Sequence, residues 1–214
     1  MVMDAFAFEK QFYAADDLYC GLDEVGRGPL AGPVVAACVI VSPAARQFEF
    51  WDDVKDSKKI AEKNRGALYD LILEHCHCGI AECSIDEIDE LNIFHASYLA
   101  MKRAYERCIA DNKLTSPSCA LVDGKHLPKL DIDMHAIIKG DNLSKTIAAA
   151  SILAKVARDR HMISLHEEHP HYDWHTNKGY GTKAHIAGLG RAGITKHHRK
   201  SFAPIKKQID SLQN

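Results

Sequence analysis

The stretch GLDEVGRGPLAGPV, residues 21–34, combines an apolar run, two adjacent acids and a dense group of turn-forming residues. Apolar and β-branched residues flank its glycines and prolines on both sides, over 18–25 and 34–41. Such a pattern is typical of a strand, a tight loop and a second, fully buried strand. We therefore expect Asp23 and Glu24 to lie at the end of the first strand, just before the loop.

The rest of the chain alternates between the two kinds of periodicity. Helical spacing of apolar residues predicts helices over 58–77, 85–110 (one helix or two) and 144–167, and short apolar runs predict strands over 79–84, 118–123 and 134–138. Strands separated by helices predict an α/β fold with a central mixed β-sheet flanked by helices. Glycine and basic residues become frequent after residue 169, so we expect one domain over 1–214, with a core at about 17–168 and a small C-terminal helical or irregular appendage at about 169–214.

Composition excludes several classes of protein. The chain has 214 residues, of which 46% are hydrophobic and 26% charged, as in an ordinary globular protein. Its apolar runs are shorter than the roughly 20 residues that cross a bilayer, and its first ten residues lack the features of a signal peptide. We therefore expect no membrane association, a cytoplasmic location and seven reduced cysteines.

Charge is divided unevenly along the chain. Residues 1–124 carry 12 basic and 21 acidic residues, whereas residues 125–214 carry 15 basic and 8 acidic ones. An acidic half can gather carboxylates around metal ions, and a basic half can hold polyphosphate. Chance segregation explains the division equally well.

Two further acids stand where apolar residues are expected. Asp123 ends the apolar run 119–122, and Asp159 shares a helical stripe with Ile152, Val156 and Ile163. A single strand-end aspartate is usually a turn or cap residue, but several carboxylates that converge from buried elements require cations between them. Adjacent strand residues point to opposite faces, so Asp23 and Glu24 reach one ion only if the glycine loop relaxes the strand or a main-chain carbonyl substitutes.

Other candidate sites are weaker. Gly26-Arg27-Gly28 matches no full phosphate-binding motif, so a tight loop is its simpler interpretation. The spacing of 75–78 (HCHC) with Cys83 is poor for structural zinc. The histidines between 161 and 198 are individually typical of surface or polar-contact residues, with 198–200 (HRK) as candidates for contact with phosphate.

Together the motifs resemble those of the bacterial ribonuclease HII family, the type 2 ribonucleases H, over about residues 19–204. The segment 21–34 carries most of the resemblance, and the others follow in the family's order: 56–59 (DSKK), 122–124 (VDG), 139–141 (KGD), 148–160 (AAASILAKVARDR), 177–182 (NKGYGT) and 198–202 (HRKSF). A departure is 193–195 (GIT), where the family more often has Gly-Pro. Only 22 residues precede Asp23, which favours type HII over type HIII, with its long N-terminal domain.

The resemblance implies a ribonuclease H-like fold and an endoribonuclease that cuts the RNA strand of RNA/DNA hybrids and ribonucleotides embedded in duplex DNA, leaving 5′-phosphate and 3′-hydroxyl ends. It implies that Asp23, Glu24, Asp123 and Asp159 are catalytic and bind two Mg²⁺ or Mn²⁺ ions, about 3.5–4 Å apart in two-metal nucleases. Substrate contacts are expected from Gly26, Arg27 and Gly28 at the ribose 2′-hydroxyl and from Tyr180 at the sugar. Candidates for contact with substrate phosphate, or for neutralising the acidic cluster, are Lys58, Lys155 and Lys178.

The expected partners are the RNA/DNA hybrid and the ribonucleotide-containing DNA duplex, bound by a monomer, and a sliding clamp is a further candidate partner. Two alternatives stay open. Another nuclease of the same fold, such as a resolvase or transposase core, would not need the pairing of Gly26-Arg27-Gly28 with Tyr180. A non-catalytic hybrid-binding module would have no reason to keep all four acids.

Overall fold

A five-stranded mixed β-sheet forms the centre of the protein in the computed structural model, which describes residues 4–14, 17–114 and 116–212. The strand order is β3-β2-β1-β4-β5; β1 and β2 are antiparallel, as are β2 and β3, whereas β4 runs parallel to both β1 and β5. The strands are β1 (Tyr19–Val25), β2 (Val34–Ile40), β3 (His77–Cys83), β4 (Cys119–Asp123) and β5 (Asp133–Ile137).

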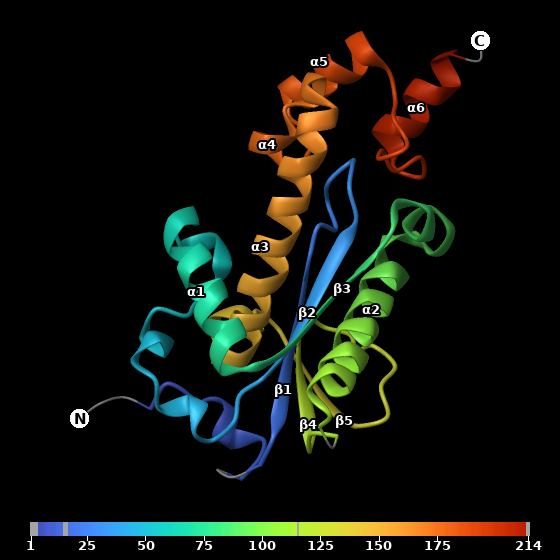
Figure 1. The fold of residues 1–214 in the computed structure, drawn as a ribbon. Helices are drawn as coiled ribbons and strands as arrows, with labels where there is room; N and C mark the ends of the chain where they lie inside the picture. Colours follow the sequence, from blue (N-terminus) through green and yellow to red (C-terminus); the bar gives the residue numbers. More distant parts are fainter. Residues whose placement is uncertain (1–3, 15–16, 115, 213–214) are drawn as a thin grey trace.

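Helices cover both faces of this sheet (Figure 1). The helices α1 (Glu62–His75) and α3 (Lys145–Glu168) lie on one face, and α2 (Ile85–Asn112) lies on the other. Alternate residues of β2 divide between the two sides: Val35 and Val39 pack with α1 and α3, and Ala36 and Cys38 with α2. Burial on both faces explains why β2 is a continuous apolar run.

The first turn of α3 packs directly on β1. A Cβ atom on Gly21 would lie only 2.4 Å from the carbonyl carbon of Thr146, so this approach requires glycine. Because Gly21 and Asp23 point to the same face of β1, the contact also places α3 over the strand end that carries Asp23.

The C-terminal segment is helical and packs on the far end of α3, above the β1–β2 loop (Figure 1). It comprises α4 (Trp174–Asn177), α5 (Lys183–Ala192) and α6 (Ala203–Leu212). Trp174, Leu189 and Ile205 form an apolar cluster with Leu30 of the loop and Met162 of α3. The expected appendage therefore shares a core with the β1–β2 loop.

Short 3-10 helices fill several connections: Glu9–Gln11, Ala45–Gln47, Glu49–Asp52, Ser57–Lys59, Gly140–Asn142 and Pro170–Tyr172. One of them corrects the helix expected over 58–77, because the Asp56 side chain accepts from the Lys58 amide at 3.0 Å and closes a separate turn. The helix α1 begins only at Glu62, and β3 already begins at His77. The long helix α2 is kinked at Asn92, whose φ of 63° is not helical.

Among the described residues, no helix is both long and apolar enough to cross a membrane.

Candidate active site

Asp23 lies at the centre of a group of carboxylates at the ends of β1 and β4. It is 6% exposed, and its Oδ1 accepts the Glu24 amide at 2.7 Å. Burial raises the pKa of Asp23 well above its ordinary value, and the negative charges of Glu24 and Asp123 raise it further. A hydrogen bond from the Ser151 hydroxyl acts in the opposite direction. This serine of α3 is itself held by Ser57, with the two Oγ atoms 2.9 Å apart.

Glu24 lies on the opposite face of β1 from Asp23, as alternation along a strand requires. Burial raises its pKa, the nearby Arg27 guanidinium opposes the shift, and Asp123 adds to it. Arg27 Nη1 lies 3.3 Å from Glu24 Oε1. The charge of Asp123 thus acts on both adjacent acids, although their side chains start from opposite faces of the strand.

Asp123, the last residue of β4, is bound to the turn that follows β5. The Gly140 amide donates to its Oδ1 at 2.6 Å. Burial raises the pKa of Asp123, the Gly140 amide lowers it, and the charge of Asp141 raises it again. The Asp141 amide and the positive charge of Lys58 oppose these increases. The structure therefore brings Asp141 to the carboxylate group, a residue that the sequence showed only as part of the motif at 139–141.

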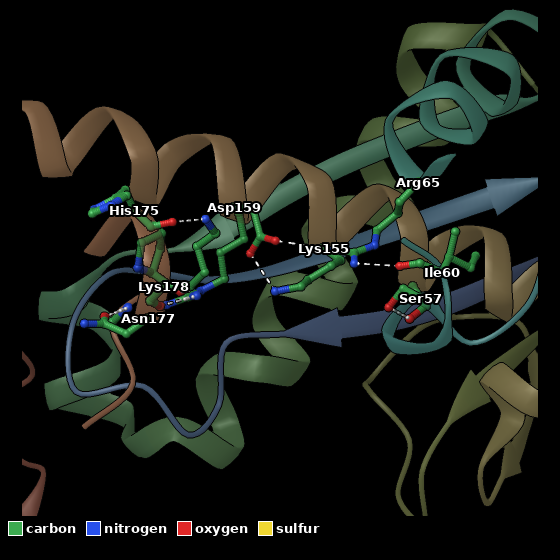
Figure 2. Close-up of polar contacts among 12 residues, drawn as sticks. Ser57, Ile60, Arg65, Lys155, Asp159, His175, Asn177 and Lys178 are labelled. Carbon is green, nitrogen blue, oxygen red and sulfur yellow. Dashed lines mark hydrogen bonds and ion pairs between the residues drawn. The ribbon is translucent and has the colours of Figure 1, made fainter. Parts of the chain in front are cut away.

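Asp159 forms ion pairs with a different set of side chains (Figure 2). Its two oxygens face cations, with Oδ1 2.7 Å from Lys155 Nζ and Oδ2 3.5 Å from Nη1 of Arg65 in α1. It follows Ser151 by eight residues on α3, a rise of about 12 Å. It lines a groove of about 180 Å³ between α1 and α3. The expected apolar stripe also ends before Ile163, which is 36% exposed.

Two buried guanidinium groups hold the loop between β1 and β2 from inside. Both are at most 1% exposed, and both donate to backbone carbonyl oxygens at 2.6–3.1 Å. Burial lowers the pKa of Arg158 to about 10 and that of Arg199 to about 9, so both remain cationic at neutral pH. Arg158 binds Ala31, Pro33 and Lys178, and Arg199 binds Gly26, Arg27, Gly32 and Pro33.

This role of Arg199 corrects the expectation that 198–200 contacts phosphate. His198 is also buried, and its Nε2 lies 3.1 Å from Nε2 of His185. Only Lys200 of the three is exposed. The sequence alone does not indicate this role of Arg199, because a basic run has the same residues whether its guanidinium faces solvent or backbone carbonyls.

The loop presents its exposed glycine to Tyr180, as the resemblance implied. A Cβ on Gly28 would lie 3.3 Å from Cε1 of Tyr180, whose side chain is 46% exposed. Gly26 is constrained differently, since its φ is +97° and a Cβ there would lie 2.2 Å from Nε of Arg158. An accessible backbone and an aromatic ring therefore lie side by side, a short distance along the chain from Asp23 and Glu24.

The three candidate lysines occupy different positions. Lys58 is exposed and its charge acts on Asp123. Lys155 pairs with Asp159, and the Lys178 ammonium donates to the carbonyl of His175 (Figure 2). Lys178 also contributes its own carbonyl to Arg158, at 2.9 Å. Of the three, Lys58 therefore has the position best suited to the carboxylate group.

The carboxylate group fits hard divalent cations. Asp23, Glu24, Asp123 and Asp141 supply oxygen donors, the ligands that Mg²⁺ and Mn²⁺ prefer. They are held together despite repulsion: besides burial, the charges of Glu24 and Asp123 raise the pKa of Asp23, and the charge of Asp141 raises that of Asp123. A bound cation would relieve that repulsion.

Sequence comparison places this chain among known nucleases. A family model described as Ribonuclease HII matches residues 20–205. A protein named Ribonuclease HII from Burkholderia cenocepacia (strain HI2424) is 48% identical over 204 residues, which cover 94% of this chain and 91% of that protein. Another from Anaplasma phagocytophilum (strain HZ) is 46% identical over 213 residues, 99% of each chain.

Solved structures show the same fold. The ribonuclease H2 from Pyrococcus horikoshii OT3 superposes with a TM-score of 0.74 at 22% identity, covering 92% of this chain and 99% of that one. Bst-RNase HIII, solved in complex with Mn²⁺, gives 0.75 at 18% identity, covering 92% and 70%. The RNase HII of a PCNA complex from Archaeoglobus fulgidus gives 0.67 at 26% identity, covering 85% and 93%. The expected α/β fold of the ribonuclease H type is thus confirmed.

Proposed function

This chain belongs to the ribonuclease HII family and is a ribonuclease H, and we propose that it cuts the RNA strand of RNA/DNA hybrids and ribonucleotides embedded in duplex DNA, leaving 5′-phosphate and 3′-hydroxyl ends. Family membership supports the reaction class. The observation that supports the substrate is the exposed backbone of Gly28 against Tyr180, close to the strand-end carboxylates.

We propose that Asp23, Glu24, Asp123 and Asp141 hold two Mg²⁺ or Mn²⁺ ions. Asp141 takes the place that the resemblance implied for Asp159. The charge of Asp141 raises the pKa of Asp123, whereas Asp159 is ion-paired with Lys155 and Arg65. Divalent ions bound to such a group supply an activated water and stabilise charge on the leaving 3′-oxygen. The related Bst-RNase HIII was solved in complex with Mn²⁺.

Residues of the chain itself orient the site. The Gly140 amide fixes Asp123, and the Ser57–Ser151 pair fixes Asp23 through the Ser151 hydroxyl. Asp159 is then a positioning residue that joins α3 to α1 through Arg65. Its pairing holds the part of α3 beyond Ser151 against α1.

Recognition of RNA rests on the β1–β2 loop. Only a backbone without side chains approaches a 2′-hydroxyl closely enough to bond it through main-chain groups. Gly26, Arg27 and Gly28 supply that backbone, and Tyr180 supplies a surface for the neighbouring sugar. Lys58 and the basic C-terminal half would hold phosphates without reading base sequence.

The assembly is also a proposal. We propose a monomer that acts in the cytoplasm, and a sliding clamp as recruiting partner, since the Archaeoglobus fulgidus relative was solved in complex with PCNA. Size-exclusion chromatography with light scattering of the purified chain, alone and mixed with a bacterial clamp, tests the monomer and the clamp interaction. A stable dimer alone, or separate elution of chain and clamp, would contradict them.

A matched pair of duplexes tests the reaction. One carries a single ribonucleotide and the other is all DNA, and each is incubated with Mg²⁺, with Mn²⁺ or with EDTA. We expect metal-dependent cleavage of the first duplex only, with end-labelling that shows a 5′-phosphate. Cleavage of both duplexes would favour a resolvase or transposase-like nuclease. Binding without cleavage in any metal would favour the hybrid-binding module.

A further inference from the structure

A second group of metal-ligating side chains lies away from the carboxylates, at the far end of α3. It consists of Glu168, the last residue of α3, His169, which caps that helix, and His197, in the loop before α6. One ligand atom from each residue can be chosen so that all three lie within 4.8 Å of one another. Two distant segments of the chain therefore converge on one point.

The histidines of this group have unused polar atoms. The Nε2 atoms of His169 and His197 are buried and have no hydrogen-bond partner in the described part of the chain. Buried polar atoms are nearly always paired, so two unpaired imidazole nitrogens on neighbouring rings require an explanation. The ring centroids of His169 and His197 are 5.2 Å apart. The nearby His185 and His198 show the usual arrangement, with their Nε2 atoms 3.1 Å apart.

We propose that Glu168, His169 and His197 form a zinc site. Two imidazoles and one carboxylate are a ligand set that Zn²⁺ takes with water in the fourth position. Tetrahedral coordination at about 2.0–2.1 Å places the ligand atoms about 3.3 Å apart, so small side-chain rotations complete the site. Nitrogen ligands disfavour Mg²⁺, which distinguishes this site from the carboxylates of β1 and β4.

The site would join the end of α3 to the segment that supports the β1–β2 loop. The His197 carbonyl accepts the Gly32 amide at 2.9 Å, and His198 forms a β-bridge with Ala31. Arg199 follows and binds four carbonyls of the same loop. Zinc bound here would therefore stabilise the loop that presents Gly28, through its supporting segment, and would take no part in the reaction.

Zinc titration of the full chain tests the proposal. The protein competes with a chelating dye for zinc, in the presence of excess Mg²⁺ that occupies the carboxylate site. Wild type is compared with His169→Gln and His197→Gln, and with His171→Gln, an exposed histidine two residues from His169. We expect each of the first two variants to lose one zinc equivalent and the third to keep it. Any zinc bound by the cysteines persists in all four proteins and cancels in the comparison.

Thermal melting gives a second measurement. At zinc concentrations about 100 times Kd, we expect the Tm of wild type and His171→Gln to rise by roughly 5–10 °C. His169→Gln should show no such rise, and Glu168→Gln, altered at an exposed ligand, should require more zinc. If His169→Gln and His197→Gln match wild type in stoichiometry and in Tm response, or if wild type binds no zinc here, the proposal is wrong. If His197→Gln does not fold, His169→Gln and Glu168→Gln decide the result.

Discussion

Arg158 and Arg199 both donate to the carbonyl oxygen of Pro33, at 2.9 and 3.1 Å, from segments 41 residues apart in the sequence. Two like charges share this buried acceptor because carbonyl dipoles of the β1–β2 loop surround them. Burial lowers the pKa of both guanidiniums, and the charge of Arg158 lowers that of Arg199 further. The loop that presents Gly28 is therefore built around two cations.

We predict that Arg199→Met destabilises the protein and loosens the β1–β2 loop that presents Gly28. The substitution leaves the buried carbonyls of Gly26 and Gly32 without their guanidinium donor, whereas Pro33 keeps Arg158, at a cost of about 3 kcal/mol or more in the free energy of unfolding. Urea denaturation measures this loss, and the neighbouring Lys200→Met, at an exposed position, is the control. Equal midpoints for the two variants would show that the buried guanidinium is dispensable.

Asp141→Asn and Asp159→Asn separate the two candidates for the fourth carboxylate. We expect Asp23→Asn, Asp123→Asn and Asp141→Asn each to lower the cleavage rate at least a hundredfold while hybrid binding is largely kept. Asp159→Asn should keep the rate within tenfold but lower the free energy of unfolding by roughly 3 kcal/mol, because Lys155 and Arg65 lose their partner. The opposite ranking of rates would restore Asp159 to the metal site.

Removing one charge from the carboxylate group should stabilise the metal-free protein. Burial and the charges of Glu24 and Asp123 raise the pKa of Asp23, so its ionised form opposes folding at neutral pH. In EDTA at pH 7.5 we expect Asp23→Asn to raise the Tm by a few degrees. The gain should disappear in saturating Mg²⁺, which compensates the wild-type charge. A lower Tm in EDTA would contradict a repulsive cluster.

Alanine substitutions at the two glycines of the loop should have different effects. Gly28→Ala places a Cβ 3.3 Å from the exposed Tyr180 ring, so we expect normal folding but about tenfold to a hundredfold slower cutting at a single ribonucleotide. Gly26→Ala meets both a φ of +97° and Arg158, and should lower the Tm. Tyr180→Ala should reduce turnover more than binding. Wild-type rates in Gly28→Ala and Tyr180→Ala would refute this model of ribose recognition.

Glu9 predicts a pH dependence of stability away from the site. Its side chain is fully buried against the start of α3, where it accepts hydrogen bonds from Ser144 Oγ at 2.8 Å and from the Thr146 amide at 3.1 Å. Burial nevertheless raises its pKa. A raised folded-state pKa gives stability that is fully present below the unfolded value of about 4.3 and is lost as pH rises through the folded value.

The stability of wild type relative to Glu9→Gln should therefore fall as pH rises above about 4.3. Denaturant midpoints across this range measure the difference, with the exposed Glu49→Gln as the control for general charge effects. A difference that is constant with pH, or that grows as pH rises, would show that Glu9 is ionised at no cost in the folded protein.

Local pattern was sufficient for the parts of the fold that depend on neighbouring residues. The two apolar runs around 21–34 predicted β1, the loop and β2, because a strand buried on both faces has no polar positions. Asp23, Glu24 and Asp123 could be identified for the same reason, as acids that end buried strands. The family motifs predicted that Gly28 meets Tyr180, which residue spacing alone does not show.

The tertiary structure decided the rest, because it depends on which distant segments pack together. Helical periodicity placed Asp159 on a stripe of α3 but could not show that Arg65 of α1 packs there and pairs with it. The turn after β5 brings Asp141 to Asp123, an approach set by the parallel pairing of β4 and β5. The same reason applies to Arg199. Its neighbours in the sequence do not show whether its guanidinium faces solvent or the carbonyls of a loop 166–173 residues away.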